Sequence, residues 1–359
     1  MVAEQRQLRA LIAAGGTVGH VAPSLAVAEA LRARGVEVTF AGSPDRVEAR
    51  LVPERGYPFD AFRVAGLPRR PGPRLVRALA LAVAAPVECA RILARRRPDV
   101  VLGGGGFVAG PMVLAARLRG IPAALTEADA HLGLANRLAL PFAQRLFLSY
   151  AIPGANRKAR VVGRPIPSTS RSLPLDEARR KLELPEDGPL VLVTGGSQGA
   201  STLNATALDA WAETGPHVLH LCGERDYERL RARVQRDDYR LLPFVGDFGA
   251  AVGSADLVVA RAGGSVWEIA AAGKPAVLVP YPHATGDHQR ANARYFADAG
   301  GAVIVDDAEA HDAVPALVAE LLADERRLRA MSEAMRAAAK PDAAERIADE
   351  LVELAAAHR

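Results

Sequence analysis

Two glycine-rich turns carry the residues of this chain that are best suited to bind phosphate. The first, Gly-Gly-Thr-Val-Gly-His, spans residues 15–20, and the second, Gly-Gly-Ser-Gln-Gly-Ala, spans residues 195–200. Each follows an apolar segment and precedes a helical pattern, so its backbone N–H groups come at a helix N-terminus, where a diphosphate binds well. One such turn in each half of the chain predicts two sites, each for a phosphorylated ligand.

The strands and helices that must position these turns repeat along the chain. The order strand, glycine turn, helix, Gly-x-Pro, strand begins at Asp99 and begins again at Asp256. Apolar strands that alternate with helices form parallel sheets, because a continuous apolar strand must be covered on both faces. The pattern predicts two doubly wound α/β domains, and it fits either a true duplication or the general likeness of two such domains.

Length and composition agree with two domains. The chain has 359 residues, more than one domain usually holds, and its 50% of hydrophobic residues can fill two cores. No apolar run is long enough to span a bilayer, and no segment resembles a signal peptide. Cys89 and Cys222 are too few and too far apart to predict a disulfide framework or a metal site. We therefore expect a cytoplasmic protein.

Positive charge comes almost entirely from arginine, and one cluster of it flanks an apolar segment. The net charge is only +4 and aromatic residues make up 5%, which argues against a nucleic-acid platform. Between residues 66 and 97, arginines border an Ala-, Leu- and Val-rich helical run interrupted at Pro86. Such a segment can lie on an anionic membrane surface. The alternative is a core helix with solvated ends.

Several stretches of the chain, in order and with similar spacing, resemble the MurG family of bacterial glycosyltransferases, glycosyltransferase family 28. They are residues 15–20, 99–111, 133–136, 195–200, 256–279 and 288–292. The resemblance implies the GT-B fold, in which two Rossmann-like doubly wound parallel-sheet domains face across a cleft. It also implies an N-terminal acceptor and membrane-associating domain, residues 1–163 with a returning helix 341–359, and a C-terminal donor domain, residues 164–340.

The activity that the resemblance implies is inverting transfer of N-acetylglucosamine from UDP-N-acetylglucosamine (UDP-GlcNAc) to the muramyl sugar of undecaprenyl-linked lipid I, which forms lipid II for peptidoglycan. The implied partners are UDP-GlcNAc, lipid I and an anionic membrane surface, and the implied location is the cytoplasmic face of the cell membrane. The departing diphosphate needs stabilisation as negative charge develops, and turn amides at helix N-termini can supply it. We therefore expect no cofactor and no metal held by the protein.

By position, the resemblance assigns donor binding to the C-terminal domain. The predicted donor-binding residues are Ser197, Gln198, Gly199, Phe244, Val245, Arg261, Gly263, Gly264, Ser265, Glu268, His288, Gln289 and Asn292. Ser197 and its turn, together with residues 263–265, would meet the diphosphate. Phe244 and the backbone of the next residue would meet the uracil. Glu268 would bind the ribose hydroxyls, unless it is a solvated helix residue, and Gln289 would meet the sugar hydroxyls.

The N-terminal domain would bind the acceptor, with the first glycine turn around the lipid diphosphate. The predicted acceptor-binding residues are Gly16, Thr17, Val18, Gly19, Phe107, Thr126, Asp129 and Asn136. His20 is the best candidate for the general base, because it follows the end of a predicted strand and has an unperturbed pKa near neutrality. The alternative is that His20 only caps or orients the loop. Glu127 follows a second strand and could supply or share the base role.

Several positions depart from the family's motifs. Val18 replaces a glycine, Phe107 replaces a tyrosine, and Thr126 and Asp129 replace the histidine and asparagine of a common His-Glu-Gln-Asn. The linker lacks the family's usual arginine, whose place Arg164 could take. These changes leave open a GT-B enzyme that uses another nucleotide sugar or glycolipid. A UDP-sugar epimerase and a nucleotide-sugar binding protein without activity are further alternatives.

Overall fold

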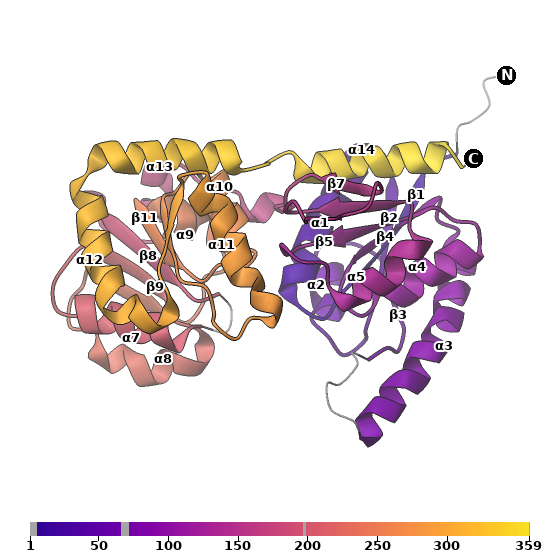
Figure 1. Cartoon of the computed structure of the whole chain (residues 1–359), viewed down its shortest axis with the longest axis horizontal. Helices are drawn as coiled ribbons and strands as arrows, with labels where there is room; N and C mark the ends of the chain where they lie inside the picture. Colours follow the sequence, from indigo (N-terminus) through magenta and orange to yellow (C-terminus); the bar gives the residue numbers. More distant parts are fainter. Residues whose placement is uncertain (1–5, 66–71, 197–198, 359) are drawn as a thin grey trace. The chain divides into compact units, whose positions relative to one another are not determined.

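The chain folds into two compact units (Figure 1). Unit 1 comprises Met1–Pro167 and Pro341–Arg359, and unit 2 comprises Ser168–Lys340. The first division falls after Pro167 instead of after residue 163, since Arg164 is hydrogen-bonded to Gly19 of unit 1. The computed structural model describes residues 6–65, 72–196 and 199–358, except for the side chains at 73–80 and 82.

Unit 1 is built on a seven-stranded sheet, in the order β3-β2-β1-β4-β5-β6-β7, whose strand pairs are parallel. Its strands are β1 (Arg9–Ala14), β2 (Glu37–Gly42), β3 (Phe59–Ala61), β4 (Val100–Gly105), β5 (Ala123–Glu127), β6 (Arg145–Leu148) and β7 (Ala159–Val161). Its helices are α1 (Val18–Ala33), α2 (Glu48–Glu54), α3 (Pro73–Arg96), α4 (Ala109–Leu118), α5 (Leu134–Ala139) and α14 (Ala343–Ala356).

Helices cover both faces of this sheet, as a continuous apolar strand requires. Leu11 and Ile12 are neighbours in β1, but their side chains point to opposite faces and join separate cores. Ile12 packs with residues of α1 and with Leu351 of α14, which lies beside α1. Leu11 packs with Leu93 of α3 and Met112 of α4. The chain therefore returns to unit 1 through α14, as the resemblance implied.

Unit 2 is built on a six-stranded parallel sheet in the order β10-β9-β8-β11-β12-β13. Its strands are β8 (Leu190–Thr194), β9 (His217–Leu221), β10 (Tyr239–Leu242), β11 (Leu257–Ala260), β12 (Ala276–Leu278) and β13 (Ala302–Ile304). Its helices are α6 (Leu175–Lys181), α7 (Ser201–Trp211), α8 (Glu224–Leu230), α9 (Phe248–Ser254), α10 (Val266–Ala271), α11 (His288–Asp298), α12 (Ala310–Ala323) and α13 (Glu325–Ala338). Two of these helices have an N-cap aspartate. Asp247 of α9 and Asp324 of α13 each accept a 2.9 Å hydrogen bond from a backbone N–H group of the first helical turn.

In each sheet the strand order reverses at one point, between β1 and β4 in unit 1 and between β8 and β11 in unit 2. Ligands of open α/β sheets bind outside the carboxyl ends of the strands at such a point. Gly15 and Gly106 follow β1 and β4, and Gly195 and Arg261 follow β8 and β11. The predicted class of two Rossmann-like, doubly wound parallel sheets is confirmed, with both glycine turns at these positions.

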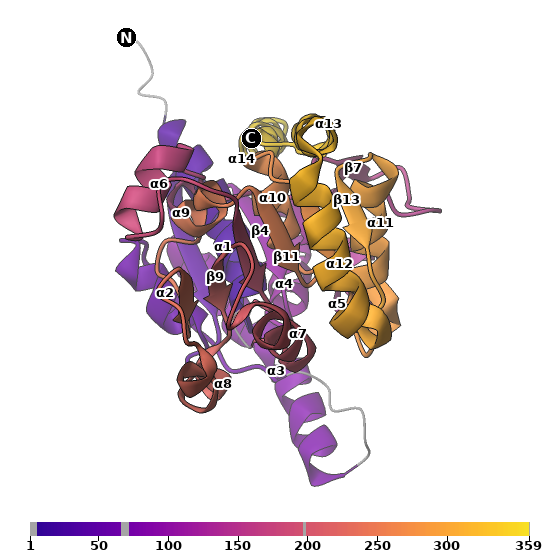
Figure 2. The ribbon, with the colours of Figure 1, turned by 90° about the vertical axis from the view of Figure 1, so that its left-hand side faces the viewer.

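Helix α3 packs on unit 1 through its C-terminal half, and its N-terminal half projects away from that unit (Figures 1 and 2). Ala85 and Cys89 are fully buried, whereas Val83 and Val87 are 79% and 55% exposed. The predicted membrane-binding segment lies partly outside the described residues, which omit 66–71 and several α3 side chains. Within the described part of the chain, no helix is both long and apolar enough to cross a membrane.

Candidate functional site

The first glycine turn joins β1 to the N-terminus of α1. Gly16 has a φ of +90°, which glycine adopts without strain. Thr17 is the N-cap, but its side chain makes no capping hydrogen bond, and the first turn of this 16-residue helix holds no acidic residue. The predicted residues Gly16, Thr17, Val18 and Gly19 therefore lie together at a helix N-terminus whose partial positive charge suits an anion.

A buried carboxylate holds this turn in place. Glu48 of α2 has no exposed surface, and it accepts hydrogen bonds from the N–H groups of Gly16 and Ser43, at 2.9 and 3.0 Å. A β-carbon at Gly15 would lie 2.2 Å from Oε1 of Glu48, so a side chain there would displace the carboxylate. Sequence reasoning missed Glu48, because nothing local distinguishes it from the exposed glutamates of other helices.

The imidazole of His20 packs on the glycines at the end of β4. A β-carbon at Gly105 would lie 2.5 Å from Cδ2 of His20, and one at Gly106 would lie 2.2 Å from the carbonyl oxygen of Gly15. Both glycines also have positive φ angles, +106° and +77°. Nδ1 of the ring lies 3.2 Å from the hydroxyl of Thr17. Glycine at both positions thus allows the ring and the first turn to approach the end of β4.

The surroundings of His20 favour its neutral form. Burial lowers the pKa of His20, and the positive charge of Arg164 lowers it further. The carboxylates of Asp129 and Glu127 and a hydrogen bond to the backbone of Gly15 oppose this shift without reversing it. A neutral imidazole is the form that can accept a proton.

The carboxylate of Glu127 is occupied by hydrogen bonds from the loop that follows β5. Its donors are the backbone N–H groups of Ala128 (3.0 Å), Asp129 (3.4 Å) and Gly133 (2.9 Å) and Nδ2 of Asn136 (2.9 Å). Asn136 also donates to the carbonyl oxygen of Thr126 at 2.9 Å. Both carboxylate oxygens therefore accept hydrogen bonds from the segment that they hold in place. This geometry favours a loop-shaping role for Glu127 and Asn136 over proton transfer.

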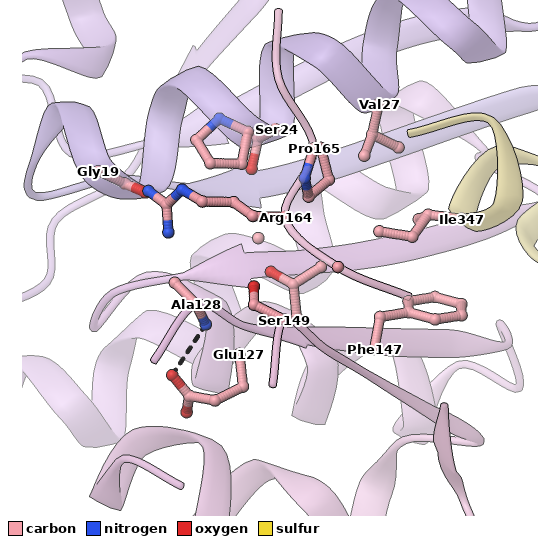
Figure 3. A pocket seen from close by; sticks show the side chains of 14 residues that line it. Gly19, Ser24, Val27, Glu127, Ala128, Phe147, Ser149, Arg164, Pro165 and Ile347 are labelled. Carbon is pink, nitrogen blue, oxygen red and sulfur yellow. Dashed lines mark hydrogen bonds between the residues drawn. The ribbon is translucent and has the colours of Figure 1, made fainter. Parts of the chain in front are cut away.

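A small cavity lies beside α1, and Arg164 projects across it (Figure 3). Its lining includes Gly19, Ser24, Thr126, Glu127, Ser149, Arg164, Pro165 and Ile347. Arg164 is 9% exposed, and its Nη2 donates to the carbonyl oxygen of Gly19 at 2.6 Å. The sequence raised Arg164 only as a substitute for a missing arginine. The structure places it on the first glycine turn.

Phe107 packs against the same turn. A β-carbon at Gly16 would lie 3.3 Å from Cε1 of the Phe107 ring. The valine at position 18 is 49% exposed, so its side chain projects outward instead of crowding the turn. Together with His20 and Asp129, which interact electrostatically, these residues form one cluster in unit 1. The structure thus brings the predicted acceptor-binding residues together.

The second glycine turn joins β8 to α7. Gly196 and Gly199 have φ angles of +78° and +70°, and the N–H of Gly199 donates to the carbonyl oxygen of Gly196 at 2.9 Å. A β-carbon at Gly199 would lie 2.2 Å from the carbonyl oxygen of Cys222, so the turn packs closely on the end of β9. Ser197 and Gln198, both predicted to bind the donor, lie outside the described residues.

Two predicted donor-binding residues support the turn after β11. Asn292 of α11 has no exposed surface, and its Nδ2 donates to the carbonyl oxygen of Ala262 at 3.1 Å. Arg261 is 8% exposed, donates to the carbonyl oxygen of Val279 at 3.1 Å and forms a 2.5 Å ion pair with Asp307. Both side chains are engaged within unit 2, so this geometry favours a supporting role over contact with the donor.

The rest of that turn is open. A β-carbon at Gly263 would have no atom within 4 Å. Gly264 and Ser265 follow, and Ser265 precedes α10 without making a side-chain cap hydrogen bond. Glu268 is half-buried in the first turn of α10. These predicted residues therefore share one edge of the unit 2 sheet with the second glycine turn.

Of the remaining predicted donor-binding residues, Phe244 and Val245 lie in the loop after β10, and His288 and Gln289 are the first residues of α11, after the loop from β12. Phe244 is 60% exposed, an unusual position for a large apolar ring, whereas Val245 is 8% exposed. Oε1 of Gln289 accepts a hydrogen bond from the N–H of Tyr281 at 2.9 Å. Nδ1 of His288 lies 2.8 Å from the carbonyl oxygen three residues earlier. Gln289 and His288 therefore stabilise the loop between β12 and α11, and the exposed ring of Phe244 is available for stacking.

Sequence comparisons agree with this arrangement. The model of the glycosyltransferase family 28 N-terminal domain matches residues 10–148, and that of the C-terminal domain matches residues 190–347. A protein of Acidithiobacillus ferrooxidans is 44% identical over 96% of this chain and 97% of its own length. It is named UDP-N-acetylglucosamine–N-acetylmuramyl-(pentapeptide) pyrophosphoryl-undecaprenol N-acetylglucosamine transferase. A protein of the same name from Halorhodospira halophila is 43% identical over 94% of this chain and 96% of its own length.

Structure comparison gives the same result. The crystal structure of MurG from Acinetobacter baumannii matches this chain with a TM-score of 0.77 and 30% sequence identity. The match covers 96% of this chain and 99% of that chain. The two family models cover both units, and the named relatives match nearly the full length. The chain therefore belongs to glycosyltransferase family 28.

Proposed function

We propose that this protein transfers N-acetylglucosamine from UDP-GlcNAc to the muramyl sugar of undecaprenyl-linked lipid I, with inversion, and so forms lipid II. The observation that carries this proposal is the 44% identity, over 96% of the chain, to a relative named for that transfer. The presence of a glycine turn at the switch point of each sheet supports it, because donor and acceptor both contain a diphosphate.

On the acceptor side, we assign the general base to His20. As the acceptor hydroxyl attacks the anomeric carbon, the bond from that carbon to UDP breaks, and the proton of the hydroxyl passes to the neutral imidazole. The lowered pKa of His20 supports this role. Gly16, Val18 and Gly19 would direct backbone N–H groups toward the lipid diphosphate. Glu127 would shape the loop beside them.

On the donor side, we assign the leaving diphosphate to the turn at 195–200 and the N-terminus of α7. Backbone N–H groups there oppose the negative charge that develops on UDP, so the proposal needs no metal held by the protein. The exposed ring of Phe244 would stack on the uracil, and Glu268 would accept hydrogen bonds from the ribose hydroxyls. Arg261 and Asn292 would hold the neighbouring turn.

We further propose that the protein binds the cytoplasmic face of an anionic membrane, where lipid I would be presented. Helix α3 supports this, because Val83 and Val87 are exposed and arginines flank the helix in sequence. An apolar surface bordered by cations suits the boundary between acyl chains and anionic head groups.

The direct test incubates the protein with lipid I and labelled UDP-GlcNAc, and follows label into lipid II. We expect transfer by the natural protein and a loss of transfer in the folded His20→Ala variant. UDP affinity, measured by calorimetry, should be the same in both because His20 lies in unit 1. A folded protein that binds UDP yet makes no lipid II would refute the proposed acceptor and donor.

One set of observations favours a second candidate. Phe107, Thr126 and Asp129 differ from the family's usual residues, and all three belong to unit 1, on the acceptor side. A family 28 enzyme that acts on another lipid-linked or glycosidic acceptor would account for them. Offering the protein UDP-GlcNAc with a panel of acceptors distinguishes the two proposals, because only the first one predicts that lipid I is the acceptor with the highest rate of transfer.

A further inference from the structure

Arg164 is a buried cation to which the proposed reaction assigns no task. It is 9% exposed, and Nη2 donates to the carbonyl oxygen of Gly19 at 2.6 Å. Gly19 immediately precedes His20 in the first turn of α1, so this bond restrains the backbone that carries the imidazole. A hydrogen bond from a charged donor is stronger than a neutral one, which makes this restraint substantial.

The charge of Arg164 is not cancelled by a direct partner. Among the described residues, no carboxylate lies within ion-pair distance of its guanidinium, although a buried charge is usually paired. Arg164 instead faces hydroxyl and backbone groups around the small cavity, including Ser24 and Ser149 (Figure 3). Its positive charge acts on the neighbouring His20, where the carboxylates of Asp129 and Glu127 oppose it.

The charges around His20 come from separate parts of unit 1. Asp129 and Glu127 contribute negative charge from the end of β5 and the loop after it, and Arg164 contributes positive charge from the linker after β7. The end of β4 contributes only glycines to this contact. Without Arg164, the two carboxylates would act on the ring with no opposing charge from the linker, and both favour its protonated form.

We propose that Arg164 is a positioning residue for glycosyl transfer, which holds the first turn of α1 through the carbonyl of Gly19 and places a positive charge beside the imidazole of His20. This inference rests on the proposed function, because it takes His20 as the base. It adds to that function a second requirement, a cation that the linker supplies 145 residues after Gly19 in the sequence.

Two substitutions separate the charge of Arg164 from its shape. Arg164→Gln keeps an N–H donor but removes the charge, and Arg164→Lys keeps the charge but loses the planar fork. In Arg164→Gln, the His20 signal, followed by NMR and assigned with the His20→Ala variant, should titrate at higher pH than in the natural protein. In Arg164→Lys, it should titrate close to the natural value.

Kinetics give the second readout. In Arg164→Gln, kcat/KM for lipid I should fall roughly tenfold or more at about pH 6, and distinctly less at about pH 8, where the base is neutral in either protein. UDP affinity should not change, because Arg164 belongs to unit 1. Arg160→Gln is the matched control: Arg160 is on the nearby β7, with a side chain 44% exposed and paired with Glu350. It should change neither readout.

The outcomes are distinct. An unchanged His20 titration in folded Arg164→Gln, or an equal loss of kcat/KM at both pH values, would overturn the proposal. If Arg164→Gln does not fold, Arg164→Lys still tests the proposal. An upward shift of the His20 titration in Arg164→Lys, which keeps the positive charge, would contradict the proposed electrostatic role. If the natural protein makes no lipid II but the titration shifts as expected, the proposed function fails, and the electrostatic link between Arg164 and His20 stands.

Discussion

Replacing Gly105 by alanine would place a methyl group against the imidazole of His20. The added carbon would lie 2.5 Å from Cδ2 of the ring, well inside van der Waals contact. Gly105 also has a φ of +106°, which alanine does not readily adopt. Gly56, in the same unit, has a φ of +70°, but a β-carbon there would meet nothing within 4 Å. Gly56→Ala therefore reports the strain of a positive φ without a clash, whereas Gly105→Ala adds the clash with the ring and a larger backbone strain.

The size of the effect follows from these two costs. A positive φ costs alanine at least about 1–2 kcal/mol in both variants, and the cost is larger at +106° than at +70°, because +106° lies outside the left-handed helical region. Forcing an extra carbon into a packed site adds about 1–3 kcal/mol, and this applies only to Gly105→Ala. For a unit of this size, 1 kcal/mol corresponds to roughly 2–4 °C in Tm. The clash alone should thus lower the Tm of Gly105→Ala roughly 2–12 °C below that of Gly56→Ala, and the larger backbone strain at Gly105 adds to this difference.

The assay compares both variants with the natural protein in thermal unfolding and in lipid II formation. If the methyl group moves the ring by about 1 Å, kcat should fall on the order of a hundredfold in Gly105→Ala. Gly56→Ala should keep its kcat, because Gly56 follows α2, away from the ring. Equal Tm and equal kcat in the two variants would show that His20 does not lie on the end of β4.

Three further predictions test the site and the membrane surface. His20→Ala should lower kcat by about 10²–10⁴-fold and leave UDP affinity unchanged. In the natural protein, kcat/KM should fall only as the pH drops through the lowered pKa of His20. A fall in kcat/KM that begins above the usual pKa of histidine would contradict the assignment of His20 as the base. Glu127→Gln should lower Tm, since an amide has only one oxygen to accept the hydrogen bonds that reach both carboxylate oxygens, and it should reduce kcat less than His20→Ala does. A complete loss of turnover with an unchanged Tm would assign the base role to Glu127 instead. Charge reversal at Arg74 and Arg77 should reduce the fraction of protein that sediments with anionic vesicles. Equal sedimentation would show that these arginines do not contribute to membrane binding.

Local patterns were sufficient to predict the fold class and the position of both glycine turns. Alternating strands and helices leave a periodic signal, and the conformations of Gly16 and Gly199 are ones that favour glycine. The acceptor residues were assigned through the family resemblance, and in the structure they lie together because the carboxyl ends of parallel strands share one edge of a sheet. His20 and Asp129, far apart in sequence, are near each other for this reason.

The roles of individual polar side chains were harder to predict. Asn292 and Arg261 carry groups that suit a ligand, yet in the structure they bond to nearby backbone and to Asp307. Glu127 had the residue type of a base, but the donors around its carboxylate come from the loop that follows. A buried polar group takes the partners that the fold places beside it, and a motif does not record those partners.

The two glycine turns, the parallel sheets and the histidine at the end of a strand could all be read from the order of residues, because each depends on neighbours along the chain. The supports of the first turn could not. Glu48 reaches Gly16 across 32 residues, and Arg164 reaches Gly19 across 145. Such contacts exist only once the sheet and its helices have packed, so the electrostatic environment of His20 is a property of the folded unit.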